Sequence, residues 1–418
     1  MGIAHSAELT VLEAGSSEQL TALGNEALMQ GRYETAIEHY RRALTVDKTS
    51  FQATFNLALA YQNLDKDSKA SRWYDEALKI SPKHAEVLCN LGYLSFRAKD
   101  WVQAEERFLL AARQAAGSTG AADYWYNVGA AREKREQWTE ARRAYDECLS
   151  LNKDHFGSHF NVGTLYLGAL ADQPKALEKA EAALTKARDL APSRAEAWVN
   201  LALCHERMDK AEAKDDINKA VEVASPTYKP HALWNRALFF DRQRPPQRLA
   251  MRDDLQAVLV LEPHYPGANG LLGAYHFAIG EFDQAAVLLN REVTGDHFDA
   301  HNTIDVEAHY LLAMLHTDHR PDSVKALSHA SAYYKLRPDS AKIQELRRRA
   351  LRMSTTFTTT SLNNAHNTNN TPNHQIEHHN SATPKTLDGH APHVHTPEKN
   401  HSAPNSHPTP AAAPAAHH

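Results

Sequence analysis

Apolar residues between positions 17 and 352 recur three and four residues apart, which is the period of an amphipathic α-helix. Residues 51–84, FQATFNLALAYQNLDKDSKASRWYDEALKISPKH, contain two such stretches joined by a short polar stretch. Pro82 follows the second stretch, and proline ends a helix because its ring removes the backbone N–H. Strand-like segments are absent from the sequence. The pattern therefore predicts an all-α protein built from pairs of helices.

The pattern repeats at intervals close to 34 residues. The recurring apolar set is clearest at Leu57, Ala58, Ala70 and Tyr74, and again at Leu91, Gly92, Ala104 and Phe108. Each pair leaves one apolar flank uncovered, so the pairs must stack on one another to complete a core. We predict nine repeats and a closing helix, at residues 17–50, 51–84, 85–121, 122–155, 156–194, 195–230, 231–264, 265–305, 306–340 and 341–352.

This pattern resembles the tetratricopeptide repeat (TPR) family, whose unit is a 34-residue helix–turn–helix. The resemblance implies an α-solenoid in which residues 17–352 form a right-handed superhelix. It also implies that the first helices of successive repeats line a concave groove that binds a peptide segment of a partner protein. The sequence contains no phosphate loop, dinucleotide fingerprint or GxSxG motif. We therefore expect a non-enzymatic scaffold or adaptor without a cofactor.

The composition is that of an ordinary folded protein, with 42% hydrophobic and 23% charged residues among 418. A net charge of -5 gives no basic excess to neutralise phosphates, so a nucleic-acid partner is not expected. No stretch reaches the roughly 20 apolar residues that cross a bilayer. The N-terminus also lacks the pattern of a signal peptide, and the three cysteines are far apart. These observations favour a cytoplasmic protein.

The composition changes near residue 353. Residues 353–418 are rich in Thr, Asn, His, Pro and Ala, contain no Trp, Tyr or Arg, and hold 11 of the 26 histidines. Such a segment buries too little apolar surface to offset the entropy lost on ordering, so we expect a disordered tail. Residues 1–16 are expected to form a flexible N-terminal segment.

One polar residue recurs in the predicted first helices of five repeats: Asn56, Asn90, Asn127, Asn161 and Asn200. An asparagine amide can donate to and accept from a peptide backbone. The row resembles the asparagine ladder in the TPR superhelix of O-linked N-acetylglucosamine transferase, which implies solvent-facing amides that hold a bound peptide. The alternative is that these asparagines only solvate the groove or bond within a helix pair.

Four aromatic residues on the same predicted face would add apolar anchors for the peptide: Phe55, Tyr93, Tyr126 and Phe160. Some TPR proteins instead bind the C-terminal carboxylates of chaperones through a clamp of cations. The positions that the resemblance assigns to those cations hold Thr21, Glu86 and Asn90 here. Since none of the three carries a positive charge, we do not expect that clamp.

Two other functions stay open. The array could self-assemble, with one copy binding another, or the protein could respond to a metal through the histidines of its tail. Within the array, four potential metal ligands are four residues apart, namely His297, His301, Asp305 and His309. On one continuous helix they would share a face. Loop-like residues between them favour packing or solvent-facing roles instead.

Overall fold

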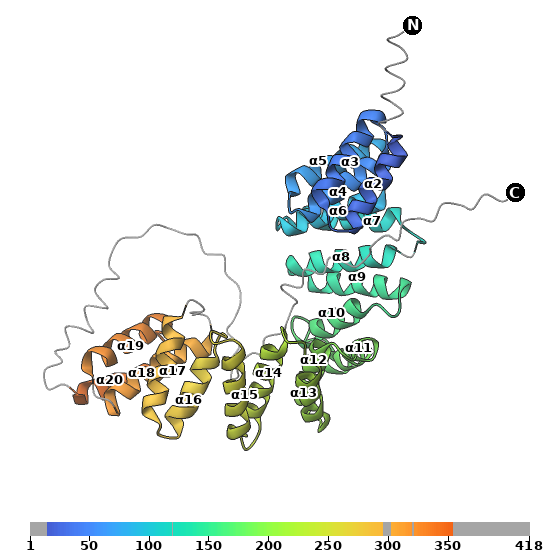
Figure 1. The fold of residues 1–418 in the computed structure, drawn as a ribbon. Helices are drawn as coiled ribbons and strands as arrows, with labels where there is room; N and C mark the ends of the chain where they lie inside the picture. Colours follow the sequence, from blue (N-terminus) through green and yellow to red (C-terminus); the bar gives the residue numbers. More distant parts are fainter. Residues whose placement is uncertain (1–14, 119, 296–301, 320–321, 354–418) are drawn as a thin grey trace, which may run out of the picture. The chain divides into compact units, whose positions relative to one another are not determined.

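The computed structural model describes residues 15–118, 120–295, 302–319 and 322–353 (Figure 1). Within these ranges every regular element is an α-helix and no strand occurs, so the all-α prediction is confirmed. The helices are α2 (Ser17–Met29), α3 (Tyr33–Val46), α4 (Phe51–Asn63), α5 (Asp67–Ile80), α6 (Ala85–Arg97), α7 (Trp101–Gln114), α8 (Ala121–Lys134), α9 (Trp138–Leu151), α10 (Phe156–Leu167), α11 (Ala176–Leu190), α12 (Ala195–Arg207), α13 (Glu212–Val223), α14 (Lys229–Arg242), α15 (Arg248–Leu261), α16 (Ala268–Ala278), α17 (Phe282–Thr294), α18 (Thr303–Asp318), α19 (Ser323–Leu336) and α20 (Lys342–Met353).

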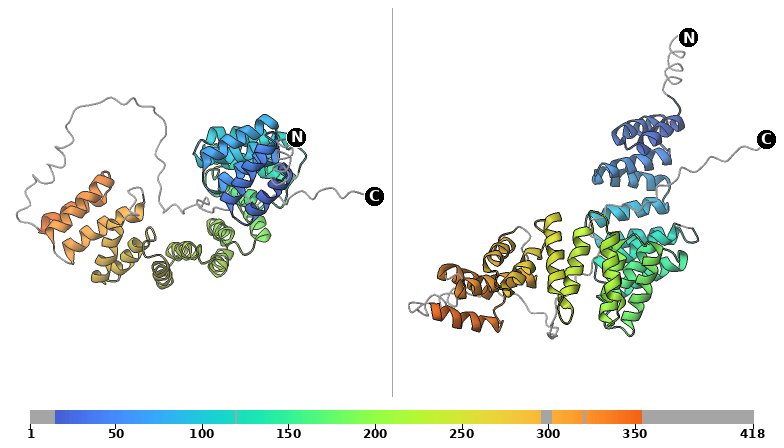
Figure 2. Two further views of the ribbon diagram at one scale, coloured as in Figure 1. Left: turned by 45° about the horizontal axis from the view of Figure 1, so that its top comes forward. Right: turned by 60° about the horizontal axis from the view of Figure 1, so that its bottom comes forward.

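The helices are arranged as hairpins. From α2/α3 to α18/α19, each first helix packs against the second helix that follows it, and α20 packs against α18 and α19. The hairpins divide into two units, an N-terminal unit that ends at Ala191 and a C-terminal unit that begins at Pro192. Within the N-terminal unit, successive hairpins lie side by side (Figure 2). The predicted repeat architecture is therefore present in the folded chain.

A close contact between a glycine and a ring holds the two helices of a hairpin together. The contact recurs in three hairpins, between Gly24 and Tyr40, between Gly92 and Phe108, and between Gly129 and Tyr145. A Cβ atom at Gly24 would lie 2.4 Å from the ring of Tyr40, and that ring is fully buried. Because only glycine leaves room for the ring, these positions set the distance between the two helices.

The turn inside a hairpin places one residue in the left-handed region of backbone conformation. Seven hairpins have such a residue, with φ between +54° and +85°: Gly31, Asp65, Lys99, Glu136, Lys175, Asp209 and Gly280. Glycine adopts this conformation freely, whereas a residue with a Cβ atom is strained by about 1 kcal/mol. The packing of the two helices, rather than local preference, therefore decides the turn conformation at the five positions that are not glycine.

Ion pairs connect successive hairpins of the N-terminal unit. Arg97 at the end of α6 lies 2.6 Å from Asp65 and 3.4 Å from Asp67 in the preceding hairpin. Arg132 on α8 lies 2.8 Å from Glu105 on α7. These pairs are partly exposed, so each contributes only about 0–1 kcal/mol to stability. Their directional contacts help to fix how one hairpin sits on the next.

In the C-terminal unit a buried carboxylate caps a helix. Glu292 on α17 is 0% exposed. Its carboxylate accepts hydrogen bonds from the backbone N–H groups of Gly267 at 3.0 Å and Gly270 at 2.6 Å. These groups belong to the start of α16, where unpaired N–H groups and the helix dipole favour a negative charge. The contact explains how a charged side chain can lie inside the stack.

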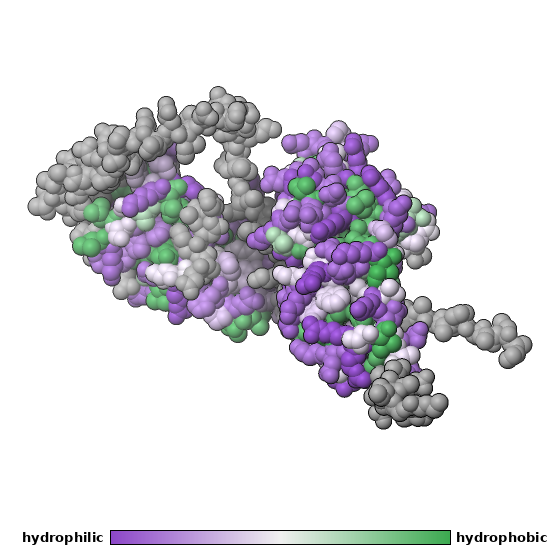
Figure 3. All heavy atoms as spheres, turned by 90° about the horizontal axis from the view of Figure 1, so that it is seen from above, coloured by the Kyte–Doolittle hydropathy of each residue, from purple (hydrophilic) through white to green (hydrophobic). Residues whose placement is uncertain are grey.

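Residues 1–14 and 354–418 lie outside the described residues, so the predicted N-terminal segment and tail are almost entirely outside them too. No helix in the described ranges combines the length and apolar character needed to cross a membrane. On the face that Figure 3 shows, the hydrophobic residues form small groups between hydrophilic ones. The apolar side chains on that face are therefore interrupted by polar surface.

Lys99 tests the strain in the turns. Its side chain is exposed and its φ is +62°. Because glycine adopts this conformation without steric strain, Lys99→Gly should raise the free energy of unfolding by about 0.5–1 kcal/mol. Urea unfolding followed by circular dichroism measures the change. The control Lys99→Ala keeps the Cβ atom and should give no gain, so equal gains from both variants would contradict the explanation.

Candidate functional site

The five asparagines of the predicted ladder lie on the first helices of successive hairpins, α4, α6, α8, α10 and α12. Asn56, Asn161 and Asn200 are buried, with exposed fractions of 6%, 7% and 2%. Asn90 and Asn127 are half-buried. The expectation that the whole row faces solvent is therefore wrong for three of its five members, because these side chains lie between packed helices.

A buried tyrosine hydroxyl explains where such an amide points. Asn161 Nδ2 donates a hydrogen bond of 2.9 Å to the hydroxyl of Tyr145. Tyr145 lies on α9 and Asn161 on α10, so the bond joins two successive hairpins. The carboxyl group of Glu133, on the first helix of the hairpin that contains Tyr145, interacts with the same hydroxyl. A phenol that would otherwise be buried without a partner is thus hydrogen-bonded.

The first two hairpins repeat this arrangement. Tyr40 donates to Asn25 Oδ1 at 2.8 Å, and Asn56 Nδ2 donates to the same oxygen at 2.7 Å. Tyr74 donates to Gln62 Oε1 at 2.8 Å, and the asparagine of α6 interacts with the Tyr74 hydroxyl. We call each of these groups a Tyr–amide junction: the tyrosine of a second helix, a polar residue of its own hairpin and the asparagine of the next hairpin. The three junctions connect the first hairpin to the second, the second to the third and the fourth to the fifth.

The asparagine loses this bond where the tyrosine is replaced. The third hairpin has Phe108 at that position, and Asn127 Nδ2 instead lies 3.6 Å from Cys89 Sγ. The fifth hairpin has Leu184, and Asn200 Nδ2 has no hydrogen-bond partner in the described part of the chain. The hydroxyl therefore decides whether the asparagine takes part in a junction.

Of the four predicted aromatic anchors, two are buried and two keep part of their surface exposed. Phe55 and Phe160 are buried, 4% and 5% exposed, and each ring stacks at 5.9 Å on the phenylalanine four positions before it. These two rings belong to the core, which corrects the expectation that they face the groove. Tyr93 and Tyr126 are only half-buried. The predicted site residues that retain exposed surface are thus Asn90, Tyr93, Tyr126 and Asn127, which we call the α6/α8 face.

Carboxylates lie beside the α6/α8 face. No described residue forms an ion pair with Glu86 on α6, whereas Asp123 Oδ1 on α8 lies 3.5 Å from His155 Nε2. Burial raises the pKa of Glu86. Burial, with a further contribution from the charges of Glu86 and Asp123, raises the pKa of Cys89 to about 12. This thiol therefore stays protonated at neutral pH and is a poor nucleophile.

The candidate metal ligands are not brought together. His297 and His301 lie outside the described residues. Asp305 on α18 is buried, and His309 on the same helix has its Nδ1 3.0 Å from Nδ1 of His329 on α19. In the ranges that the structure describes, no group of three or more His, Cys, Asp or Glu residues is arranged to hold a metal ion. His309 thus packs against another histidine within its hairpin.

The tyrosines of the second helices carry a signal for the junctions that the asparagines alone do not show. Tyr40, Tyr74 and Tyr145 each precede the ladder asparagine of the next repeat by 16 residues. Leu184 also precedes Asn200 by 16 residues, so the separation marks the position and only a tyrosine there supplies the hydroxyl. Gln62 and Glu133 carried no such signal, because both polar residues stand among others at the ends of first helices.

Stacked hairpins joined through such seams define a helical-repeat protein, and comparison with known families identifies the repeat. A profile described as "TPR repeat" matches residues 24–65. Profiles described as "Tetratricopeptide repeat" match residues 51–84 and 122–155. The chain therefore contains tetratricopeptide repeats.

Curated relatives share only part of their length with this chain. Tetratricopeptide repeat protein 8 of Caenorhabditis elegans is 28% identical over 151 residues, which are 35% of this chain and 30% of that protein. The human cell division cycle protein 16 homolog is 23% identical over 163 residues, 38% of this chain and 26% of that protein. The chain thus spans less than a third of the length of either relative.

Solved structures of other proteins superpose on part of this chain. PilF of Pseudomonas aeruginosa is 20% identical and superposes on 59% of this chain and 97% of its own, with a TM-score of 0.44. The C-terminal part of a TPR repeat-containing protein from Cytophaga hutchinsonii is 15% identical, with 59% and 96% covered and a TM-score of 0.48.

Tyr145→Phe tests the Tyr–amide junction. The substitution keeps the ring against Gly129 but removes the hydroxyl that accepts from Asn161. Because the Asn161 amide is then buried without this acceptor, the free energy of unfolding should fall by about 1–3 kcal/mol. Urea unfolding of Tyr145→Phe, Asn161→Ala and the double variant measures the coupling. Purely additive effects of the two changes would contradict the junction.

Glu133→Gln tests the charge at the same junction. Burial raises the pKa of Glu133 to about 7, from an ordinary value of 4.5. The folded chain then binds the proton more tightly than the unfolded chain, so this group contributes stability below about pH 4.5 that is lost as the pH rises through 7. Glutamine stays neutral, as Gln62 does at the junction of the second hairpin.

At pH 8 the free energy of unfolding of the variant should therefore exceed that of the wild-type protein by up to about 3 kcal/mol, whereas at pH 4 the two should match. The control Glu147→Gln changes an exposed carboxyl group of the same hairpin and should have little effect at either pH. A gain from Glu133→Gln that is equal at both pH values would rule out the titration of this group as its cause.

Proposed function

We propose that this protein is a non-enzymatic scaffold that binds an extended segment of a partner protein at the α6/α8 face. Repeat proteins of this kind use stacked hairpins as extended binding surfaces. The single observation that carries the proposal is the position of Asn90 and Asn127, which are half-buried while the asparagines of α4 and α10 are buried.

The chemistry of these two amides suits a peptide backbone. An asparagine side chain offers both an acceptor oxygen and an NH₂ donor, which match the N–H and C=O groups of an extended chain. Asn127 Nδ2 makes a long contact of 3.6 Å with a sulfur, which is a weak acceptor, whereas Asn90 also interacts with the hydroxyl of Tyr74. Tyr93 and Tyr126 supply partly exposed rings beside the amides. The face therefore combines backbone-binding groups with apolar surface.

The charge beside the face favours a basic partner segment. Glu86 has no ion-pair partner among the described residues and is already partly removed from water. A lysine or arginine of the bound segment would compensate this charge and restore the pKa of the carboxyl group. A segment with an acidic C-terminus would instead meet like charge at this place.

The test starts from a random-peptide library displayed on phage and selected on the full-length protein. The selected peptides that bind at the α6/α8 face should contain a basic residue. Each is then measured by fluorescence anisotropy against Asn90→Ala/Asn127→Ala, which should bind at least five-fold more weakly than the wild-type protein. A melting curve checks that the variant remains folded.

The matched control is Gln52→Ala/Asn63→Ala, which removes two exposed amides from α4. It should bind the selected peptides as the wild-type protein does. If the α6/α8 variant binds them with unchanged affinity, the proposed face is not the binding site. If the peptides that lose affinity in Asn90→Ala/Asn127→Ala are predominantly acidic, the role of Glu86 is contradicted.

A further inference from the structure

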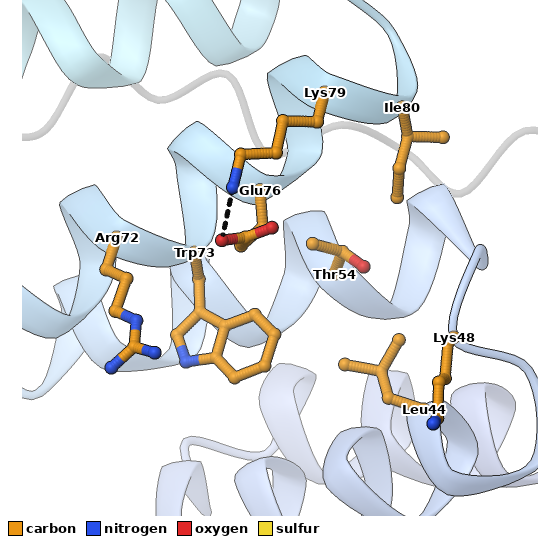
Figure 4. A pocket seen from close by; sticks show the side chains of 8 residues that line it. All are labelled: Leu44, Lys48, Thr54, Arg72, Trp73, Glu76, Lys79 and Ile80. Atoms are coloured by element: carbon orange, nitrogen blue, oxygen red, sulfur yellow. Dashed lines mark hydrogen bonds and ion pairs between the residues drawn. The ribbon is translucent and has the colours of Figure 1, made fainter.

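A pocket of about 320 Å³ lies in the N-terminal unit between α3, α4 and α5 (Figure 4). It opens on a different side of the hairpins from the predicted groove. Thr54 lines the pocket, whereas the ladder residue of α4 is two positions further along. Two positions turn a helix by about 200°, so the pocket and the ladder face different directions. The pocket is therefore separate from the α6/α8 face.

One wall of the pocket is apolar. The indole of Trp73 lies in the middle of the lining side chains, and Leu44 faces it from the neighbouring hairpin (Figure 4). Both residues are half-buried, and Ile80 at the rim is 39% exposed. An aromatic residue and two aliphatic ones thus share a concave surface that a bulky apolar side chain would cover.

The rest of the lining is basic. Lys79 Nζ donates to Glu76 Oε1 at 2.8 Å, so these two charges compensate each other. Lys48 and Arg72 form no ion pair with any residue that the structure describes, and both are exposed. Arg72 lies on one side of the indole and Lys48 on the other (Figure 4). The pocket thus carries two uncompensated positive charges in a protein whose net charge is -5.

We propose that this pocket is a second binding site, which takes an acidic segment of a partner protein. One bulky apolar side chain of the segment packs on Trp73 and Leu44, and carboxylates on either side of it pair with Lys48 and Arg72. The volume is at the lower end of the range for ligand pockets, about 300–1,000 Å³, which suits one side chain rather than a helix. The arginine guanidinium can bind a carboxylate through two parallel hydrogen bonds.

The opposite charge of the two surfaces makes the proposals independent. The α6/α8 face has an unpaired carboxylate and selects a basic segment, whereas the pocket has unpaired cations and selects an acidic one. A partner with segments of both kinds could bind both surfaces, and linking two binding segments strengthens binding without any new contact. Failure of one proposal leaves the other standing, because different peptides and different variants test them.

The probes are fluorescein-labelled octapeptides Gly-Asp-Glu-X-Leu-Glu-Asp-Gly, with Phe, Trp, Leu or Ala at X. In a matched set, every Asp is replaced by Asn and every Glu by Gln. Anisotropy with the full-length protein should show micromolar to sub-millimolar binding of an acidic peptide with a bulky X. Its Ala version and its neutral counterpart should each bind at least five-fold more weakly. If no acidic peptide binds better than its neutral counterpart, the proposal is wrong.

The variant Lys48→Glu/Arg72→Glu should weaken binding of the best acidic peptide at least ten-fold. The control Arg32→Glu/Arg42→Glu reverses two exposed charges of the same unit outside the pocket and should change binding less than two-fold. Equal losses in the two variants would show general charge attraction and overturn the assignment. Sedimentation at several concentrations gives the last check. An oligomer that dissociates on Lys48→Glu/Arg72→Glu would make a second copy of this chain the occupant instead.

Discussion

The seam between successive hairpins is the contact on which the rest of the N-terminal unit depends. A hairpin of two short helices cannot bury its own apolar faces, so it is stable only beside a neighbour. In this protein the seam is built around one side chain. The ring of Tyr145 fills the space left by Gly129 within its hairpin, and its hydroxyl reaches Asn161 of the next. Packing and hydrogen bonding thus act through the same residue.

The junctions also distinguish asparagines whose amides are bonded within the stack from those whose amides can still bind a partner. Where a tyrosine hydroxyl is present, the following asparagine takes part in a junction. Asn56 and Asn161 are buried there, whereas Asn90 beside Tyr74 remains half-buried. Where Phe108 replaces the tyrosine, Asn127 keeps only a weak contact to sulfur and remains half-exposed. The loss of one oxygen atom in the third hairpin therefore coincides with the part of the face that can offer its amide to a partner.

Charge distinguishes the two surfaces that we propose as binding sites. The α6/α8 face is flanked by Glu86, a carboxylate without an ion-pair partner in the described part of the chain. In the pocket beside Trp73, Lys48 and Arg72 carry positive charges that no described residue compensates. The α6/α8 face is made by first helices, whereas most of the pocket is made by second helices, so a single unit presents opposite charges on different sides. A repeat architecture allows this because each helix of a hairpin keeps one flank outside the core.

The helices, their pairing and the class of repeat could all be predicted from the amino-acid sequence, because apolar spacing and a 34-residue period are properties of the chain alone. The position of each glycine under a ring was also readable, as for Gly24 and Gly92. The burial of each asparagine could not be read from the sequence, because it depends on how neighbouring hairpins pack. Asn90 is half-buried beside the Tyr74 hydroxyl, whereas Asn200 is buried although Leu184 offers no hydroxyl. The pocket was likewise invisible in the sequence, since Leu44 and Trp73 come from different hairpins and meet only when these stack. Local periodicity fixes elements, whereas contacts between repeats fix the environment of each side chain.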